Sequence, residues 1–227
     1  MTGLVPYLHL TILSLKWFKA TVLKFALGMS QTLPTYSWSQ YGIREGAKYL
    51  VNAPAANTAI DHYFPMSNPP AVVGFDIEWR PVFRKGQPEN PVSLIQISTA
   101  EVILLIQVSS MSGVFPVALA RLLADPRVAK AGVGIQGDVK KVFKDWDVGP
   151  IRNVVELGLL AKSVDNEHWK GRYKDPVGLA RLVEYYEHKM LPKGRITRSN
   201  WEAIPLSPGQ IDCKFFLAHL TAVLSAS

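Results

Sequence analysis

Two carboxylates two residues apart interrupt a segment that otherwise has the composition of a buried strand. Asp76 and Glu78 lie in the run Ala71-Val-Val-Gly-Phe-Asp-Ile-Glu-Trp79, which is rich in β-branched and aromatic residues. Alternate side chains of a strand share a face, so these two like charges repel each other. A hard divalent cation between them would offset the repulsion, because Mg²⁺ and Mn²⁺ take carboxylate oxygens readily. The alternative is a strand edge where both groups are solvated or paired with Arg80 and Arg84.

A third carboxylate follows a glycine-rich turn between a predicted strand and a predicted helix. The turn is Gly132-Val-Gly-Ile-Gln-Gly137, and Asp138 comes directly after it. Glycines permit tight backbone geometry and close approach by a ligand. Two interpretations are open here: Asp138 caps the helix by accepting from free amide groups, or it joins Asp76 and Glu78 at a metal site.

The elements that would position these residues describe an α/β fold. Apolar patterning predicts five strands, of which the first three form a meander, over residues 71–79, 92–98, 102–106, 129–134 and 153–156. Residues 99–101 suit the hairpin between the second and third strands. Helices are expected over residues 116–124, 137–146 and 178–187, and from about residue 207 onward.

Two helices carry specific signals. The helix over residues 178–187 places Leu179, Leu182, Val183 and Tyr186 on one apolar stripe. For the last helix, Ser207 followed by Pro208 and Gln210 is a capping-box pattern.

Several separated segments resemble, in the same order, the Werner-type branch of the DEDD exonucleases, which is related to RNase D and the proofreading exonucleases. The resemblance spans about residues 70–217 and implies an RNase H-like, mixed five-stranded sheet flanked by helices. Its motifs are Phe75-Asp-Ile-Glu-Trp79 with Pro81, Pro91-Val-Ser-Leu-Ile-Gln-Ile-Ser98, Gly132-Val-Gly-Ile-Gln-Gly-Asp-Val-Lys-Lys141, Ser199-Asn-Trp-Glu202, Pro205-Leu-Ser207 and Gln210-Ile211.

The resemblance implies a metal-dependent hydrolase that acts on the 3′ ends of DNA or RNA. In that family two divalent ions, Mg²⁺ or Mn²⁺, bind the carboxylates; one ion activates a water and both stabilise charge on the phosphate. Asp76, Glu78 and Asp138 match three of the family's four carboxylates. We therefore expect these three residues to be both catalytic and metal-binding.

The family's last motif, a tyrosine followed four residues later by an aspartate, is altered in this chain. Aligned from Gln210-Ile211, the two positions are Cys213 and Leu217. Leucine cannot ligate a metal, and a thiol is a poor partner for Mg²⁺. Activity is thus expected to be weak or lost, with a catalytically inactive nucleic-acid-binding pseudo-exonuclease or scaffold as the alternative. The tail from about Cys213 is a true divergence, a splice form or a mispredicted end.

An aromatic residue and a basic loop are the predicted nucleic-acid contacts. The resemblance suggests that Trp79 wedges against the terminal base, whereas the alternative is a core tryptophan. Lys193, Arg195 and Arg198 form a basic loop before the last helix that could hold phosphates, with solvated surface charge as the alternative.

A second basic stretch follows the first motif. Arg80, Arg84 and Lys85 lie between the first two predicted strands and could likewise hold phosphates or be solvated surface charge.

Composition fits an intracellular nucleic-acid-binding protein. The chain has 227 residues, 48% of them hydrophobic, and a net charge of +7, which favours polyanions. Its single cysteine excludes an intramolecular disulfide and a cysteine-based zinc site. We expect a nuclear protein, with the mitochondrion or cytoplasm as alternatives, and a role in DNA repair.

Two regions are expected along the chain. Residues 1–35 are an N-terminal extension, either a presequence or disordered, and residues 36–227 form the exonuclease-like domain. No stable membrane insertion is expected, because Pro6, His9 and three lysines interrupt the early apolar stretches.

Overall fold

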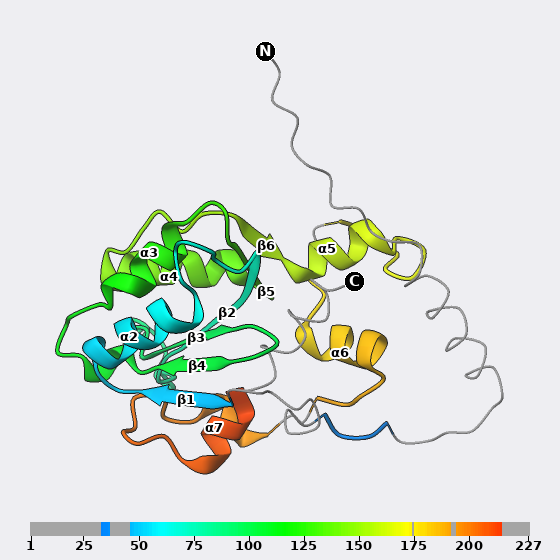
Figure 1. The fold of residues 1–227 in the computed structure, drawn as a ribbon. Coiled ribbons are helices and arrows are strands. Elements are labelled where there is room, and N and C mark those ends of the chain that lie inside the picture. Colours follow the sequence, from blue (N-terminus) through cyan, green and yellow to red (C-terminus); the bar gives the residue numbers. More distant parts are fainter. Residues whose placement is uncertain (1–32, 37–45, 174, 192–193, 215–227) are drawn as a thin grey trace.

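The structure, a computed structural model, describes residues 33–36, 46–173, 175–191 and 194–214. A mixed six-stranded sheet of order β1-β4-β3-β2-β5-β6 forms its centre, with helices on both faces (Figure 1). The strands are β1 (Ala47–Leu50), β2 (Val72–Glu78), β3 (Leu94–Ser98), β4 (Ile103–Ile106), β5 (Ala129–Gly132) and β6 (Val154–Glu156). The helices are α2 (Ala53–Tyr63), α3 (Val117–Ala124), α4 (Ile135–Trp146), α5 (Leu157–Val164), α6 (Leu179–Glu187) and α7 (Pro208–Lys214), with 3-10 turns η2 (Val108–Ser110) and η3 (Arg195–Arg198). The predicted α/β class is confirmed.

The strand directions match the predicted topology. β2, β3 and β4 pair antiparallel as a meander, and the hairpin between β3 and β4 is closed by the Thr99 amide, which donates to the Val102 carbonyl at 2.9 Å. β5 pairs parallel to β2, and β6 parallel to β5.

The sheet has one strand more than the five predicted. β1 pairs parallel to β4, from Ala47 beside Ile103 to Leu50 beside Ile106. All four β1 residues are half-buried, so this edge strand lacks the alternation that reveals a strand in a sequence. Helix α2 follows it, capped by Asn52, whose side-chain oxygen accepts from the Ala55 amide at 2.9 Å. Both elements precede residue 70, where the predicted core began.

The two faces of the sheet are covered by different elements. Val73, Phe75 and Ile77 point into the larger core, which α2, α3 and α4 cover. On the opposite face, Leu94 and Leu105 pack with Trp201, which is fully buried, beneath the segment that leads into α7. We call this second side the carboxylate face, because Asp76 and Glu78 belong to it.

Helices α5 and α6 enclose a further apolar cluster beside β5. Leu182 and Val183 are fully buried there, and Leu179 and Tyr186 pack against the cluster, so the predicted stripe of α6 is confirmed. Within the described ranges, none of the helices has the length and apolarity to cross a membrane.

Candidate active site

Asp76 and Glu78 occupy the carboxyl end of β2, in the interior of the sheet. They are half-buried and alternate with Phe75 and Ile77, which face the larger core. The ladder to β5 ends at Gly74, whereas the ladder to β3 continues to Glu78. Both carboxylates therefore stand beyond the end of β5, on a strand that is not at the sheet edge.

Gly132 brings the end of β5 against β2 next to Asp76. A Cβ atom at position 132 would lie 2.6 Å from the Phe75 carbonyl oxygen, so no larger residue fits without a backbone shift. Gly134 then has φ +74°, a left-handed conformation, and the helix α4 begins at Ile135. Since α4 packs against β2, this turn sets the position of Asp138.

Asp138 lies in the first turn of α4, and the prediction that it caps the helix is wrong. The helix begins two residues earlier than predicted, with Gly134 at the N-cap position. A carboxylate in the first turn is still favoured by the helix dipole. The structure therefore leaves its second predicted role, beside Asp76 and Glu78, as the interpretation to test.

Glu156, which the sequence analysis did not single out, binds the free amides at the start of α4. Its Oε2 accepts from the Gly134 amide at 2.8 Å and from the Ile135 amide at 3.1 Å, and its Oε1 accepts from Gly158 at 3.4 Å. One carboxylate thus joins the end of β6 to the starts of α4 and α5. The only sequence signal was an acidic residue at the end of a predicted strand.

The predicted capping box is present and fixes the start of α7. The Ser207 amide donates to Gln210 Oε1 at 3.0 Å, and the Gln210 amide donates to Ser207 Oγ at 3.3 Å. Gln210 Nε2 also donates to the Asn200 carbonyl and to Ser199 Oγ, both at 3.0 Å. The Ser199-to-Gln210 motif therefore anchors α7 on the carboxylate face. Cys213 lies half-buried on this helix, and Leu217 falls outside the described residues.

Trp79 sits at the border of the larger core with a cation over its ring. The Lys141 ammonium lies 4.7 Å from the ring centroid. This contact fits the core interpretation of Trp79, and its stacking on a terminal base stays a prediction. Of the basic loop, Arg198 is exposed at the end of η3, which packs against α7; Arg195 begins η3, and Lys193 lies outside the described residues.

The chemistry of the carboxylate face fits a hard divalent cation. Within the described part of the chain, no three acidic, histidine or cysteine side chains lie close enough to hold one ion. Asp76 and Glu78 nevertheless supply oxygen donors on one face. Beside them, Gln96 is 2% exposed and its amide has no hydrogen-bond partner among the described residues, so these residues alone do not complete its polar environment.

Comparison with known proteins points to one family. The model of a family described as 3′-5′ exonuclease matches residues 53–212. The chain is 40% identical over 141 residues to the bifunctional 3′-5′ exonuclease/ATP-dependent helicase WRN of Mus musculus, and 39% identical over 144 residues to a 3′-5′ exonuclease of Arabidopsis thaliana. These matches cover 61% and 62% of the chain but only 9% and 46% of the two relatives.

Solved structures share the fold at lower identity. RNase D of Trypanosoma brucei in complex with GMP superposes with a TM-score of 0.63 at 16% identity, over 82% of this chain and 58% of that one. RNase D of Escherichia coli gives 0.62 at 20% identity, over 79% and 43%.

Proposed function

Because this chain belongs to the 3′-5′ exonuclease family, we propose that it removes nucleotides from the 3′ ends of nucleic acid by metal-dependent hydrolysis. One observation carries the proposal: Asp76 and Glu78 share a face of β2 beyond the end of β5, where the turn into α4 begins. Asp138, in the first turn of that helix, is the third carboxylate of the proposed site.

The three carboxylates would hold the metal ions on which this family depends. We propose Mg²⁺ or Mn²⁺, since both prefer oxygen ligands. When bound, such ions lower the pKa of a water molecule and neutralise charge on the scissile phosphate. The protein's part is to keep Asp76 and Glu78 aligned through the β2–β3 ladder and to place Asp138 through the cap that Glu156 supplies to α4.

Cleavage of labelled oligonucleotides tests this proposal. Single strands of DNA and of RNA, labelled at the 5′ end, are incubated with the purified chain and Mg²⁺ or Mn²⁺. We expect a ladder of shortened labelled products that is absent with EDTA and in Asp76→Ala. Release of internal fragments, or equal cleavage by Asp76→Ala, would refute the proposal.

A second function, nucleic-acid binding without cleavage, is favoured by Cys213. This residue stands on α7 at the position where the resemblance places a tyrosine, and a thiol is a poor group for orienting water beside Mg²⁺. Under this alternative the wild-type chain binds oligonucleotides and leaves them intact in both metals. The same cleavage assay, run beside a binding measurement, separates the two functions.

A further inference from the structure

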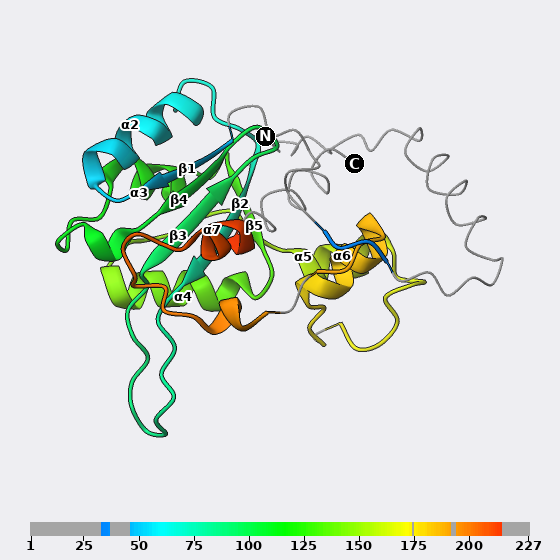
Figure 2. The same cartoon turned by 90° about the horizontal axis from the view of Figure 1, so that it is seen from below.

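The loop between β2 and β3, residues 79–93, begins directly after Glu78 and projects from the molecule. Figure 2 shows it reaching away from the sheet at the end where β2 leaves and β3 enters. Its return strand places Leu94 beside Glu78, and the Ser93 amide donates to the Glu78 carbonyl at 2.8 Å. The base of the loop therefore borders the candidate active site.

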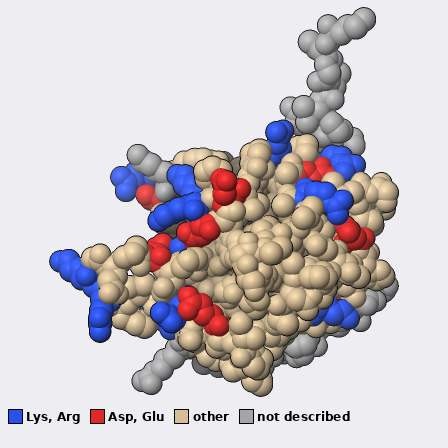
Figure 3. Space-filling model, turned by 90° about the vertical axis from the view of Figure 1, so that its left-hand side faces the viewer, with Lys and Arg blue, Asp and Glu red and all other residues tan. Residues whose placement is uncertain are grey.

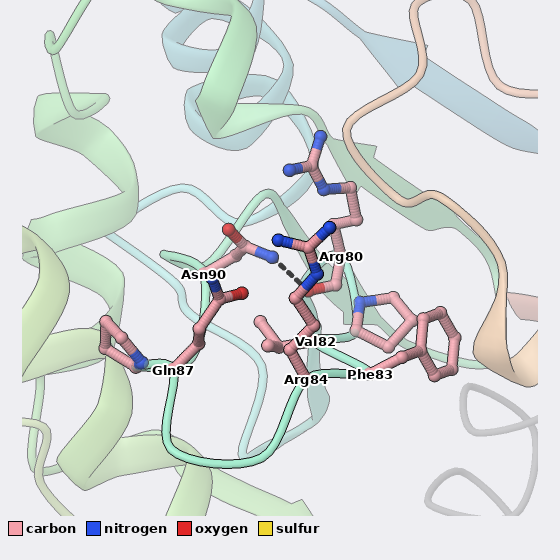
Figure 4. Close-up of a pocket in the computed structure, with 8 residues that line it drawn as sticks. Arg80, Val82, Phe83, Arg84, Gln87 and Asn90 are labelled. Atoms are coloured by element: carbon pink, nitrogen blue, oxygen red, sulfur yellow. Dashed lines mark hydrogen bonds between the residues drawn. The ribbon is translucent and has the colours of Figure 1, made fainter.

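Several hydrogen bonds fix the base of this loop to itself and to α4. Asn90 Nδ2 donates to the Arg80 carbonyl at 2.7 Å and joins the two arms (Figure 4). Lys141 Nζ, on the buried side of α4, donates to the Asn90 carbonyl at 2.9 Å. Asp145 Oδ2 accepts from the Val92 amide at 2.9 Å. The projecting part thus starts from a fixed base.

Charges at the base of the loop are paired, whereas those at its tip have no ion-pair partner among the described residues. Arg80 pairs with Glu202 at 3.2 Å, and Glu89 pairs with Lys141 at 3.4 Å. Arg84 and Lys85 are exposed and form no ion pair with any residue the structure describes. Figure 3 shows basic side chains at the outer end of a protrusion on this side of the molecule.

The tip also exposes an aromatic ring. Phe83 is 81% exposed, more than the other large apolar side chains found exposed in the described ranges. It lines an open hollow of about 480 Å³ with Arg80, Arg84 and Gln87. In Figure 4, Phe83 lies on the arm opposite Gln87 and Asn90 and is turned away from them. An exposed aromatic ring beside two exposed cations matches the combination that binds single strands, in which bases stack on aromatic rings and cations hold phosphates.

We propose that the tip of the β2–β3 loop binds single-stranded nucleic acid ahead of its 3′ end. Phe83 stacks on an unpaired base, and Arg84 and Lys85 hold the phosphates on either side of it. The inference rests on the proposed function, because it assigns this strand to the substrate whose 3′ end reaches Asp76 and Glu78. Stacking on a base and contacts to phosphates do not involve the 2′-hydroxyl of the sugar, so the loop accepts DNA and RNA alike.

Binding measured without cleavage tests the loop. Fluorescence anisotropy in EDTA follows the binding of the purified chain to labelled single-stranded DNA and RNA. We expect Phe83→Ala to weaken both by about 10-fold, in line with one lost base stack. The double variant Arg84→Gln/Lys85→Gln should lower the slope of log Kd against log salt by about 1.4. This is the change expected when two phosphate contacts on a single strand are lost.

Matched controls come from the rest of the fold. Phe143→Ala removes another exposed phenylalanine, 58% exposed on α4, and Arg152→Gln removes an exposed cation before β6; both should bind as wild type. If the loop variants kept the affinity and the salt slope of wild type, the loop proposal would be overturned. Cleavage by the wild-type chain would in that case still support the proposed function. A wild-type chain that binds no single strand would overturn the loop proposal, and a chain that also fails to cleave would overturn both.

Discussion

Asp76 on β2 and Gln96 on β3 are direct cross-strand partners, and their side chains share the carboxylate face. Gln96 is buried, yet neither atom of its amide has a partner among the described residues. A buried amide without a partner costs about 1–3 kcal/mol, so its presence beside a carboxylate needs a reason. We attribute it to the hydrated cation of the proposed site.

Gln96→Leu should therefore separate stability from metal binding. Without metal, the free energy of unfolding should stay equal to that of wild type or rise by about 1 kcal/mol, because the orphaned amide is removed. With Mn²⁺, the stabilisation should be smaller than in wild type. Urea unfolding in EDTA and in Mn²⁺ measures both.

Gln107 supplies the control for this comparison. It is equally buried, but its Nε2 donates to the Trp201 carbonyl at 2.8 Å and to Ser109 at 2.9 Å. Gln107→Leu should therefore destabilise by about 1–3 kcal/mol with or without metal. If Gln96→Leu destabilised the metal-free protein as much, the amide would have an unrecognised partner in the folded chain.

Glu156→Ala should destabilise the protein by about 1–2 kcal/mol, because two amides at the start of α4 lose their acceptor. The cleavage rate should fall by more than the loss of stability explains, because the turn at the start of α4 that Glu156 caps also positions Asp138. Urea unfolding and cleavage rates measure the two effects. Glu167→Ala, an exposed carboxylate with no hydrogen bond found in the described ranges, should change neither. A wild-type cleavage rate in Glu156→Ala would show that the cap of α4 does not position the candidate active site.

The interaction of Asp125 with Arg127 predicts that the protein loses stability in acid. The Arg127 guanidinium and amide hold the pKa of Asp125 at about 2, below its ordinary value of 3.8. A carboxyl whose pKa is lowered by folding stabilises the protein above its unfolded pKa and loses this contribution as pH falls from about 4 to about 2. Asp125→Asn should be less stable at pH 7 and show a flatter pH dependence in that window. Asp61→Asn, which breaks an exposed pair with Arg121, is the control and should change the stability at pH 7 by less than about 1 kcal/mol.

The double variant Cys213→Tyr/Leu217→Asp should raise cleavage by about 10-fold or more, because it restores a fourth carboxylate and its companion tyrosine. The reaction rate with Mn²⁺ measures the gain. Cys213→Tyr alone should recover less, since it adds no ligand. No gain in the double variant would show that the two positions do not correspond to the family's tyrosine and aspartate.

Local patterns revealed the elements that hold the candidate site. The period of two in β2 identified Asp76 and Glu78 as one face, and the Ser207-to-Gln210 spacing identified the start of α7, because a strand and a capping box depend on neighbours within a few residues. Both features are present in the structure.

Contacts between distant residues could not be read in the same way. The helix start before Asp138 was misplaced because its cap comes from Glu156, 22 residues after Gly134. Lys141 is buried between Asp145, Asn90 and the Trp79 ring, and contacts of this kind leave no local pattern in the sequence. Strand β1 was missed because its pairing to β4 joins segments more than 50 residues apart, and no local pattern records such a pairing.

Mn²⁺ titration of the purified chain, followed by calorimetry, tests most directly whether the three carboxylates form one metal site. Wild type should bind, and Asp76→Asn, Glu78→Gln and Asp138→Asn should each lower the affinity by about 10-fold or more, the loss of about 1.4 kcal/mol per ligand. Asp147→Asn, at the exposed end of α4, should titrate as wild type. Wild-type affinity in Asp138→Asn would contradict the account, because this residue would then not share a site with Asp76 and Glu78.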